Sequence, residues 1–242
     1  MKLQHLEFGV GVQLSDDGAV LPIRHIIGIG RNYREHAREQ GVEAPERPMV
    51  FTKNPAAACL AGDQVVIPDL CRDEATGGPH QVDFEAELGV VLGSAVKDVA
   101  VEEALACVLG YTCVNDISAR WWQKQGSGGQ FCRGKSFDTF CPLGPVVVPA
   151  AEIPDPQDLR VICRLNGAVM QQDTTGNMMH TVAGLIAELS RGTTLLPGTL
   201  IMTGTPGGVG MARTPPVYLK DGDTVEVEIP RIGTLKNRVV NG

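Results

Sequence analysis

The stretch Gln81–Leu92, QVDFEAELGVVL, decides how the chain folds around its centre. Its acids, Asp83, Glu85 and Glu87, stand at every second position, and apolar residues occupy the positions between them. Because successive side chains of a strand point to opposite faces, this alternation predicts a strand with all three acids on one face. The apolar run that follows, LGVVL, indicates that the strand is buried on both faces.

Carboxylates on a buried strand face need compensating positive charge or protonation. A solvated strand face is the alternative, and it is the usual explanation for acidic residues in general. No basic residue alternates with Glu85 and Glu87 in this stretch, so we favour a divalent cation with oxygen ligands. Asp83 is either a further ligand or a residue at the start of the strand, and we favour the second.

A third oxygen ligand is available where Asn115 and Asp116 follow the apolar segment 111–114. Acids at the end of a buried strand often face a site, although either residue could instead cap the next helix. With Asp116 the predicted ligand set is Glu85, Glu87 and Asp116, which contains neither His nor Cys. Such sets suit Mg²⁺ or Mn²⁺, with water or substrate completing the octahedron.

The stretch 31–41, RNYREHAREQG, places His36 and Glu39 three residues apart on an expected short helix. At this spacing the two side chains share one helix face and can form a hydrogen bond. A histidine oriented by a glutamate is a general base with a defined tautomer. The same pair is common on surface helices, so the spacing alone leaves its role open.

Two lysines and a glycine-rich segment are further candidates for ligand binding. Lys135 follows a glycine-rich break and Lys53 ends an apolar strand, and either could equally be a solvated charge. The segment 203–210, TGTPGGVG, follows a buried strand; its amides, including that of Gly204, and the Thr205 hydroxyl could hold a carboxylate. An ordinary turn is the alternative. A phosphate loop is disfavoured because the chain has no G-x-x-x-x-G-K-[ST] motif.

The composition is that of an ordinary globular protein, with 242 residues of which 43% are apolar and 20% charged. A formal net charge of −7 and a pI near 5.2 argue against a nucleic-acid or anionic-membrane binder. No apolar run approaches the roughly 18 residues of a membrane span, and we expect no signal peptide at the start. The seven scattered cysteines form no Cys-x-x-Cys pair, so we expect reduced thiols and a cytoplasmic location.

The order of elements predicts one strand-rich α+β domain with a few short helices. We expect a short N-terminal β segment over residues 1–20, turning at Ser15–Gly18, and a single catalytic domain over 21–242. Asn166-Gly167 predicts a tight β-hairpin turn. The other expected elements are strands at 23–29, 49–53, 64–67, 111–114, 146–148, 160–166, 168–172, 200–203, 224–229 and 233–239, and helices at 33–40 (capped by Asn32), 101–109, 116–124 and 179–189.

Six segments in this order resemble the fumarylacetoacetate hydrolase family over about residues 24–240. They are GIGRNYREHAREQG, FTKNPAA, VDFEAELGVVLG, GYTCVNDISAR, GKSFDTFCPLGP and IMTGTPGGVG. Any one of them is weak, but six in register over the chain are specific. The resemblance is greatest to the domain-containing branch of the family, which includes acylpyruvases and oxaloacetate tautomerases.

The resemblance implies a mixed β-roll or β-sandwich, a homodimer, and bound Mg²⁺ or Mn²⁺. Gln123 falls near the substrate-contacting glutamine of the family. The site residues that the resemblance implies are Glu85, Glu87 and Asp116 as metal ligands, His36, Glu39 and Lys135 as catalytic residues, and Thr205 and Gln123 as substrate contacts. Gly204 and Lys53 are further candidate substrate contacts from the segments described above.

The implied substrates are small 2-oxo or 2,4-dioxo (di)carboxylic acids, which react through an enolate that the metal stabilises. C–C bond hydrolysis, as of acylpyruvates or fumarylpyruvate, and keto–enol isomerisation both remain open. Only hydrolysis requires an activated water, which His36 and Glu39 would supply. Oxaloacetate tautomerisation or decarboxylation and isomerisation of 2-hydroxyhepta-2,4-diene-1,7-dioate are alternatives, and a non-catalytic dicarboxylate-binding protein is a remote one.

Overall fold

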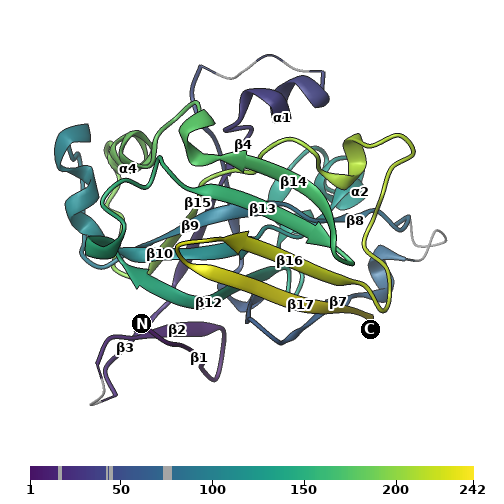
Figure 1. Cartoon of the computed structure of the whole chain (residues 1–242), viewed down its shortest axis with the longest axis horizontal. Coiled ribbons are helices and arrows are strands. Elements are labelled where there is room, and N and C mark those ends of the chain that lie inside the picture. The colour runs from purple at the N-terminus through teal and green to yellow at the C-terminus, as the bar shows by residue number, and fades with distance from the viewer. Residues whose placement is uncertain (16–17, 42, 44–45, 73–77) are drawn as a thin grey trace.

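Two large β-sheets make up most of the computed structural model, which describes residues 1–15, 18–41, 43, 46–72 and 78–242 (Figure 1). The larger sheet has seven strands; β4–β15 and β12–β6 are parallel pairs, and the other neighbours run antiparallel. Its spatial order is β5 (Met49–Lys53), β4 (His25–Gly30), β15 (Thr199–Met202), β9 (Ala86–Leu92), β10 (Val108–Asn115), β12 (Cys141–Pro149) and β6 (Ala58–Leu60).

The second sheet has five strands, which are antiparallel except for the pair β17–β7. The hairpin β13–β14 turns at Asn166 and Gly167, whose φ angles of 51° and 82° match the positive values of a type I′ turn. This hairpin confirms the prediction from the Asn-Gly pair. The spatial order is β14 (Ala168–Thr174), β13 (Arg160–Leu165), β16 (Thr224–Ile229), β17 (Gly233–Asn241) and β7 (Gln64–Ile67).

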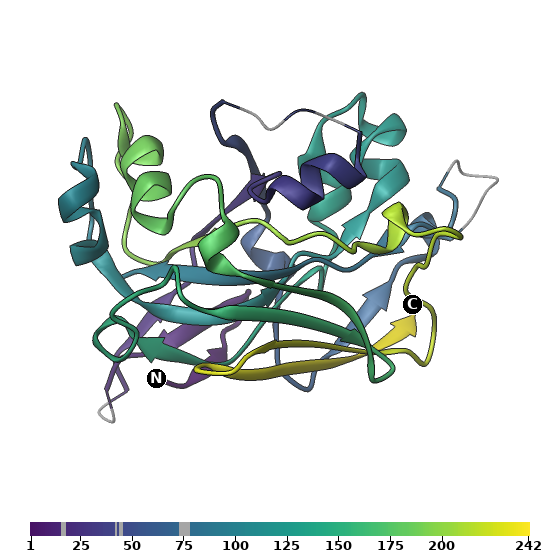
Figure 2. The same ribbon diagram turned by 45° about the horizontal axis from the view of Figure 1, so that its top comes forward.

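The main core lies between the two sheets, which are stacked face to face (Figure 2). Leu88 and Val90 of β9 pack there with Val161 of β13 and Val227 of β16. The next residue of the strand, Val91, belongs to a second apolar cluster on the other side of the seven-stranded sheet. Every residue of β9 is buried, which confirms the prediction of a strand covered on both faces.

A small N-terminal sheet covers the outer side of the seven-stranded sheet. It consists of β1 (Leu3–His5), β2 (Val10–Gln13) and β3 (Val20–Pro22), and the valines of β2 belong to the second apolar cluster. The turn expected at residues 15–18 includes positions outside the described residues.

The helices are short, and α1 and α2 lie on the same side of the sheets in both ribbon views (Figures 1 and 2). None of the helices in the described ranges is long and apolar enough to cross a membrane. The helices are α1 (Arg34–Glu39), α2 (Arg120–Gln123), α3 (Phe131–Lys135) and α4 (Val182–Ser190), and 3₁₀ segments occur at Pro55–Ala57, Asp69–Cys71, Val101–Cys107, Gln125–Ser127, Ala150–Glu152, Thr175–Asn177 and Gly210–Ala212.

The acidic stretch is not one continuous strand, contrary to the prediction. β8 (Val82–Asp83) pairs with β11 (Ser118–Ala119), and β9 begins only at Ala86. The ladder is interrupted because the Glu85 N–H donates to the Asn115 side chain at 3.0 Å instead of to a neighbouring strand. Asp83 instead accepts from Arg120 and from the backbone N–H groups of Gly210 and Met211.

Three helical features of the structure also differ from those expected from the sequence. Most of the segment 116–124 is not helical, because part of it forms β11, and only α2 remains. The expected helix 101–109 is a 3₁₀ segment that gives way to β10 at Val108. Asn32 does not cap α1, because its amide donates to the carbonyls of His180 and Thr203 at 2.9 and 2.8 Å.

Candidate active site

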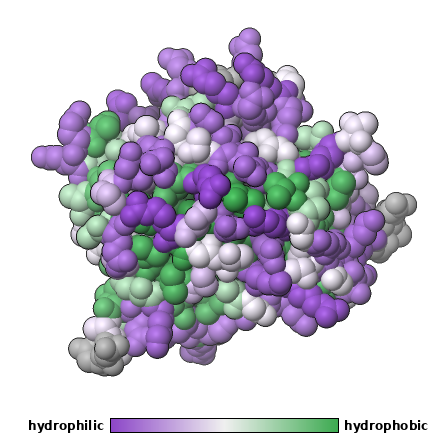
Figure 3. Space-filling view, viewed as in Figure 1, coloured by the Kyte–Doolittle hydropathy of each residue, from purple (hydrophilic) through white to green (hydrophobic). Residues whose placement is uncertain are grey.

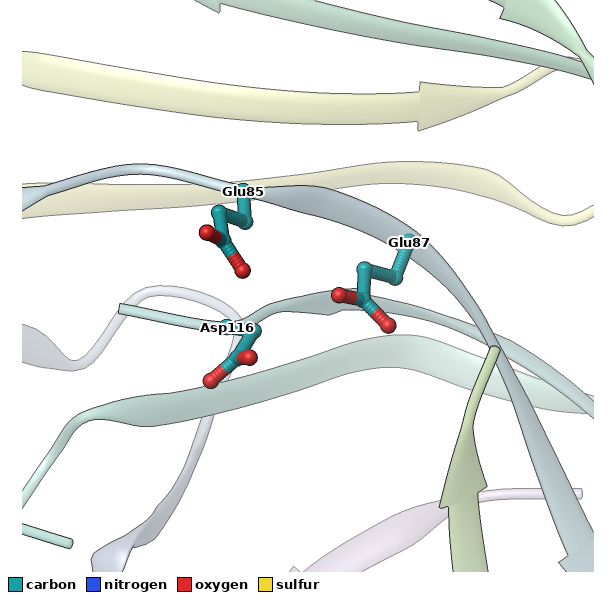
Figure 4. Close-up of side chains that lie close together, drawn as sticks. All are labelled: Glu85, Glu87 and Asp116. Atoms are coloured by element: carbon teal, nitrogen blue, oxygen red, sulfur yellow. The ribbon is translucent and has the colours of Figure 1, made fainter. Parts of the chain in front are cut away.

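Three acids from two neighbouring strands form a buried cluster. Glu85 precedes β9, Glu87 lies within it, and Asp116 follows β10. The antiparallel register pairs Asn115 with Ala86, and the Asp116 N–H consequently donates to the Glu85 carbonyl at 2.8 Å. Carboxylate oxygens from the three side chains all lie within 4.8 Å of one another (Figure 4). The fold therefore brings the whole predicted ligand set together.

Three buried cations surround this cluster. Lys135 Nζ bridges two of the acids, donating to Glu85 Oε2 at 2.7 Å and to Asp116 Oδ2. Lys53 Nζ donates to Asp116 Oδ1 at 2.5 Å. Arg120 Nη1 lies 2.7 Å from Glu85 Oε1. Glu85 and Asp116 thus have both carboxylate oxygens paired with positive charge.

The surrounding charges move the pKa values of the two glutamates in opposite directions. Burial by itself raises the pKa of Glu85, but attraction to Lys135 and Arg120 holds it well below its usual range. Burial raises the pKa of Glu87 well above its usual range, and repulsion from Asp116 and Glu85 adds to this effect. Glu87 is consequently the acid of this cluster that most needs further positive charge.

The donor set fits a hard divalent cation. Glu87 is 1% exposed and has no ion-pair partner in the described part of the chain; its Oε2 accepts the Gly204 N–H at 2.6 Å. Together with Asp83, the described site holds four buried acids against the three buried cations Lys53, Arg120 and Lys135. A divalent ion at the cluster would allow Glu87 to ionise, and carboxylate oxygens are the ligands that Mg²⁺ and Mn²⁺ prefer.

The expected dyad hydrogen bond is present on α1. His36 Nδ1 lies 2.7 Å from Glu39 Oε1, and the histidine is only 3% exposed. Glu39 Oε2 accepts the Gly208 N–H at 2.7 Å, and His36 Nε2 lies 2.8 Å from Gln40 Nε2. Each ring nitrogen therefore has a hydrogen-bond partner, and the two partners fix the orientation of the imidazole.

The glycine-rich loop 203–211 binds carboxylates, as its sequence predicted, but these carboxylates belong to the protein itself. The expected role of Gly204 is therefore corrected, because its N–H holds Glu87 and not a substrate. The N–H groups and their acceptors are Gly204 with Glu87 (2.6 Å), Gly208 with Glu39 (2.7 Å), Gly210 with Asp83 (2.8 Å) and Met211 with Asp83 (3.0 Å).

Thr205 lines the cavity described below, but its hydroxyl is engaged within the protein. It donates to the Ala86 carbonyl at 2.9 Å and accepts from Gln171 Nε2 at 2.8 Å. Gln171 also accepts the Ala86 N–H at 3.0 Å. Gln171 was not predicted, because a single glutamine in a strand carries no pattern. It connects the five-stranded sheet to the loop and to β9.

Lys53 has a structural role instead of the expected substrate contact. Its Nζ donates to Asp116, to the Ile117 carbonyl at 3.2 Å and to the Phe140 carbonyl at 2.6 Å. An ammonium group has three N–H donors, so none remains for a substrate. Lys135, in contrast, lines the cavity.

A cavity of about 120 Å³ brings half of the predicted site residues to one place. Its walls come from segments that lie far apart in the sequence. They include His36, Glu85, Arg120, Gln123, Lys135 and Thr205.

Arg120 was not among the predicted site residues, yet it is 3% exposed and central to this wall. Its Nε donates to Asp83 Oδ2 at 2.9 Å, and its Nη1 donates to Gln123 Oε1 at 3.0 Å. Nη2 lies 2.8 Å from Asp83 but outside hydrogen-bond geometry, and it has no hydrogen-bond partner among the described residues. Asp83, Gln123 and Glu85 thus fix the guanidinium at the cavity wall. The pairing with Asp83 depends on the fold and gives no signal in the sequence.

The strand-rich roll, the buried carboxylate cluster and the His–Glu dyad are together the features of one family of enzymes. A model of the fumarylacetoacetate hydrolase C-terminal family matches residues 25–240, and the chain belongs to this family.

Two curated relatives are oxaloacetate tautomerases. The chain is 46% identical to YisK of Bacillus subtilis over 220 residues, which cover 90% of this chain and 70% of YisK. It is 42% identical to mitochondrial FAHD2A of Homo sapiens over 215 residues, or 89% of this chain and 66% of FAHD2A. The chain thus spans slightly less than two thirds of the length of FAHD2A.

Solved structures of the family are similar as well. The fumarylacetoacetate hydrolase of Exiguobacterium antarcticum matches with a TM-score of 0.80 and 39% identity, covering 95% of this chain and 80% of that one. The 2-hydroxyhepta-2,4-diene-1,7-dioate isomerase of Mycobacterium marinum matches with a TM-score of 0.76 and 38% identity, covering 92% and 77%.

Proposed function

We propose that this chain interconverts the keto and enol forms of a small 2-oxo dicarboxylic acid and requires a divalent metal. One observation carries the proposal: the acid Glu85, the base His36 and the cations Lys135 and Arg120 meet in one small cavity. The names of the relatives, oxaloacetate tautomerases and a dienedioate isomerase, support this reaction class. Oxaloacetate is therefore the first substrate to test.

The metal would be held by Glu85, Glu87 and Asp116, and when bound it would supply Lewis acidity to the 2-oxo group. Lys135 supplies a second positive charge. Burial by itself lowers the pKa of Lys135, but attraction to Asp116 and Glu85 raises it above its usual value. Lys135 therefore stays protonated and stabilises negative charge that develops on the substrate.

Arg120 is the group best placed to bind a substrate carboxylate. Its Nη2 is buried without a hydrogen-bond partner among the described residues, and Asp83 and Gln123 hold the rest of the guanidinium in place. A carboxylate would satisfy the unpaired N–H groups in a charge-assisted hydrogen bond. This requirement favours dicarboxylic acids over neutral 2-oxo compounds.

His36 would carry the proton between carbon and oxygen. Its Nε2 takes a proton from carbon 3 of the 2-oxo acid, and the C–H electron pair becomes part of the new C=C bond. The same proton then goes to the oxygen at carbon 2, which completes the enol. Glu39, 2.7 Å from Nδ1, stabilises the imidazolium that forms between the two steps.

Oxaloacetate tautomerisation followed spectroscopically with Mg²⁺ tests the proposal. Glu85→Ala and Glu87→Gln should abolish Mg²⁺-dependent activity, and His36→Ala should lower the rate by about 100-fold or more. Glu226→Gln, a change far from the cavity on β16, serves as the control. Full activity of the Glu85 and Glu87 variants, or in excess chelator, would refute the metal assignment.

Hydrolysis of an acylpyruvate is the second candidate, and the close His36–Glu39 pair favours it. A base of this kind can activate water as well as a C–H group. A panel of acylpyruvates, oxaloacetate and 2-hydroxydienoates distinguishes the two, because only hydrolysis releases a separate carboxylic acid product.

A further inference from the structure

Gln40 contacts the proposed base directly. It follows α1 as its C-terminal cap residue, four positions after His36, and it therefore shares the histidine's helix face. Its Nε2 lies 2.8 Å from His36 Nε2, and its Oε1 accepts from Arg31 Nε at 3.2 Å. All three side chains line the cavity.

The direction of each hydrogen bond in this chain follows from Arg31. Because an arginine side chain only donates, it must face the oxygen of the Gln40 amide. The NH₂ group of Gln40 then faces His36, so His36 Nε2 must accept. A neutral imidazole carries one hydrogen, which is consequently on Nδ1 and donates to Glu39 Oε1. Turning the Gln40 amide over would bring two donors together at Arg31.

Arg31 reaches Gln40 from an unusual backbone conformation. Its φ of +54° lies in the left-handed region, which residues other than glycine rarely adopt. This turn between β4 and α1 brings the start of the segment back towards its end at Gln40. The nine-residue separation is bridged by side chains and not by the helix itself.

We propose that Gln40, oriented by Arg31, is a positioning residue that keeps the lone pair of His36 on Nε2. The inference deepens the proposed function, since Nε2 is the nitrogen that would take the substrate proton. Glu39 alone does not determine this arrangement, because a carboxylate also accepts from a doubly protonated ring. Gln40 adds a donor at Nε2, which only a ring nitrogen with a lone pair can accept. Substrate or water takes the place of the Gln40 N–H during turnover.

The test is ¹⁵N NMR of the His36 ring in the full chain with Mg²⁺, comparing Gln40→Glu with Gln40→Leu. Wild type should show a hydrogen on Nδ1 and a pyridine-type Nε2. Gln40→Glu replaces the donor by an acceptor, so Nε2 should gain a hydrogen and proton transfer should fall by about 100-fold or more. Gln40→Leu removes the donor and leaves Glu39 as the ring's partner, so part of the rings should carry a second hydrogen on Nε2, and activity should fall by less than in Gln40→Glu.

Arg31→Gly provides a second arm, because glycine tolerates the positive φ while removing the donor. The Gln40 amide should then turn over in part of the molecules, and both ring tautomers should appear. Arg38→Ala, an exposed change on the same helix, is the control and should leave the ring spectrum unchanged.

A wild-type ring with its hydrogen on Nε2, or a Gln40→Glu ring that matches wild type, would overturn the inference. The NMR pattern is read without turnover. If it appears as expected while His36→Ala retains activity, the proposed function fails and the role of Gln40 stands.

Discussion

Lys53 and Lys135 differ in their contacts because their ammonium groups approach Asp116 from different sides. Both are buried and both donate to Asp116. Lys53 approaches from the side of the core, where two backbone carbonyls take its remaining N–H groups. Lys135 approaches from the cavity and pairs with Glu85 as well. The first lysine holds Asp116 in place from within the protein, and the second lies at the cavity wall.

Lys53→Met should destabilise the protein strongly although the residue does not line the cavity. It leaves a buried carboxylate with one cation fewer and two buried carbonyls without their donor, and breaking such a buried pair costs about 3–5 kcal/mol. Urea unfolding measures the change. The control is Lys236→Met, which removes an exposed ion pair with Glu226 and should cost below about 1 kcal/mol. Similar losses in the two variants would contradict the role assigned to Lys53.

Glu87 should make the metal-free protein less stable as the pH rises. Its raised pKa means that the folded protein binds this proton more tightly than the unfolded chain does. The contribution is complete below pH 4.5, the ordinary pKa, and is lost as the pH rises towards the folded-state pKa. In chelator, the melting temperature of wild type should therefore fall more steeply above this pH than that of Glu87→Gln. Parallel curves would show that Glu87 ionises normally.

At the scale of elements, the loop 203–211 is the part that assembles the site. Its amides hold Glu87, Glu39 and Asp83, which belong to the acid cluster, the dyad and the Arg120 pair. Gln171 connects the same loop to the five-stranded sheet through Thr205. A carboxylate that accepts backbone N–H groups is held in a defined orientation. The loop therefore aligns three functional groups from different segments at once.

Gly208→Ala should disturb the dyad without removing a metal ligand. Gly208 has a φ of +101°, and an added Cβ would lie 2.3 Å from the Met170 carbonyl, so the loop must shift away from Glu39. We expect activity to fall by at least about tenfold while Mg²⁺ affinity, measured by calorimetry, changes little. Gly207→Ala is the matched control; its Cβ would be 3.3 Å from Glu35, and its effect should be smaller. A larger effect at Gly207 would argue against the anchoring role of Gly208.

At the scale of the whole molecule, the acid cluster Glu85, Glu87 and Asp116 lies where the buried interior meets the cavity. Glu85 precedes a strand that is buried on both faces and Glu87 lies within it, so both side chains are surrounded by the protein interior. The surface around α1 is mostly hydrophilic, whereas apolar side chains gather at the lower left of the same view, beside the N-terminal sheet (Figure 3). The homodimer remains a proposal, which sedimentation would test against the chain mass of 25.8 kDa.

Mg²⁺ should stabilise the folded protein as a whole. A ligand that binds only the folded state adds about 2.7 kcal/mol at a free concentration of 100 times its Kd. The melting temperature of wild type should therefore rise with Mg²⁺, and that of Glu85→Ala should not. Lack of any rise in wild type, at concentrations that support activity, would contradict the proposed ligand set.

The sequence by itself determined which acids form the cluster, where most strands run, and the spacing of His36 and Glu39. The pairs Glu85–Glu87 and His36–Glu39 follow from local periodicity, because alternation and helical spacing place side chains on one face regardless of the rest of the chain. Asp116 was predicted from its position directly after a buried strand. The residues that resemble the family also predicted the fold.

Only the tertiary structure decided which partner each polar group meets. Asp83 pairs with Arg120 across 37 positions, and Gly208 holds Glu39 across 169. No local pattern encodes such pairs, because they depend on sheet register and on how the loops pack against it. For the same reason Lys53 and Gly204 were assigned to substrate, while Arg120 and Gln171 were missed. A buried donor takes whichever acceptor the packed fold brings within reach.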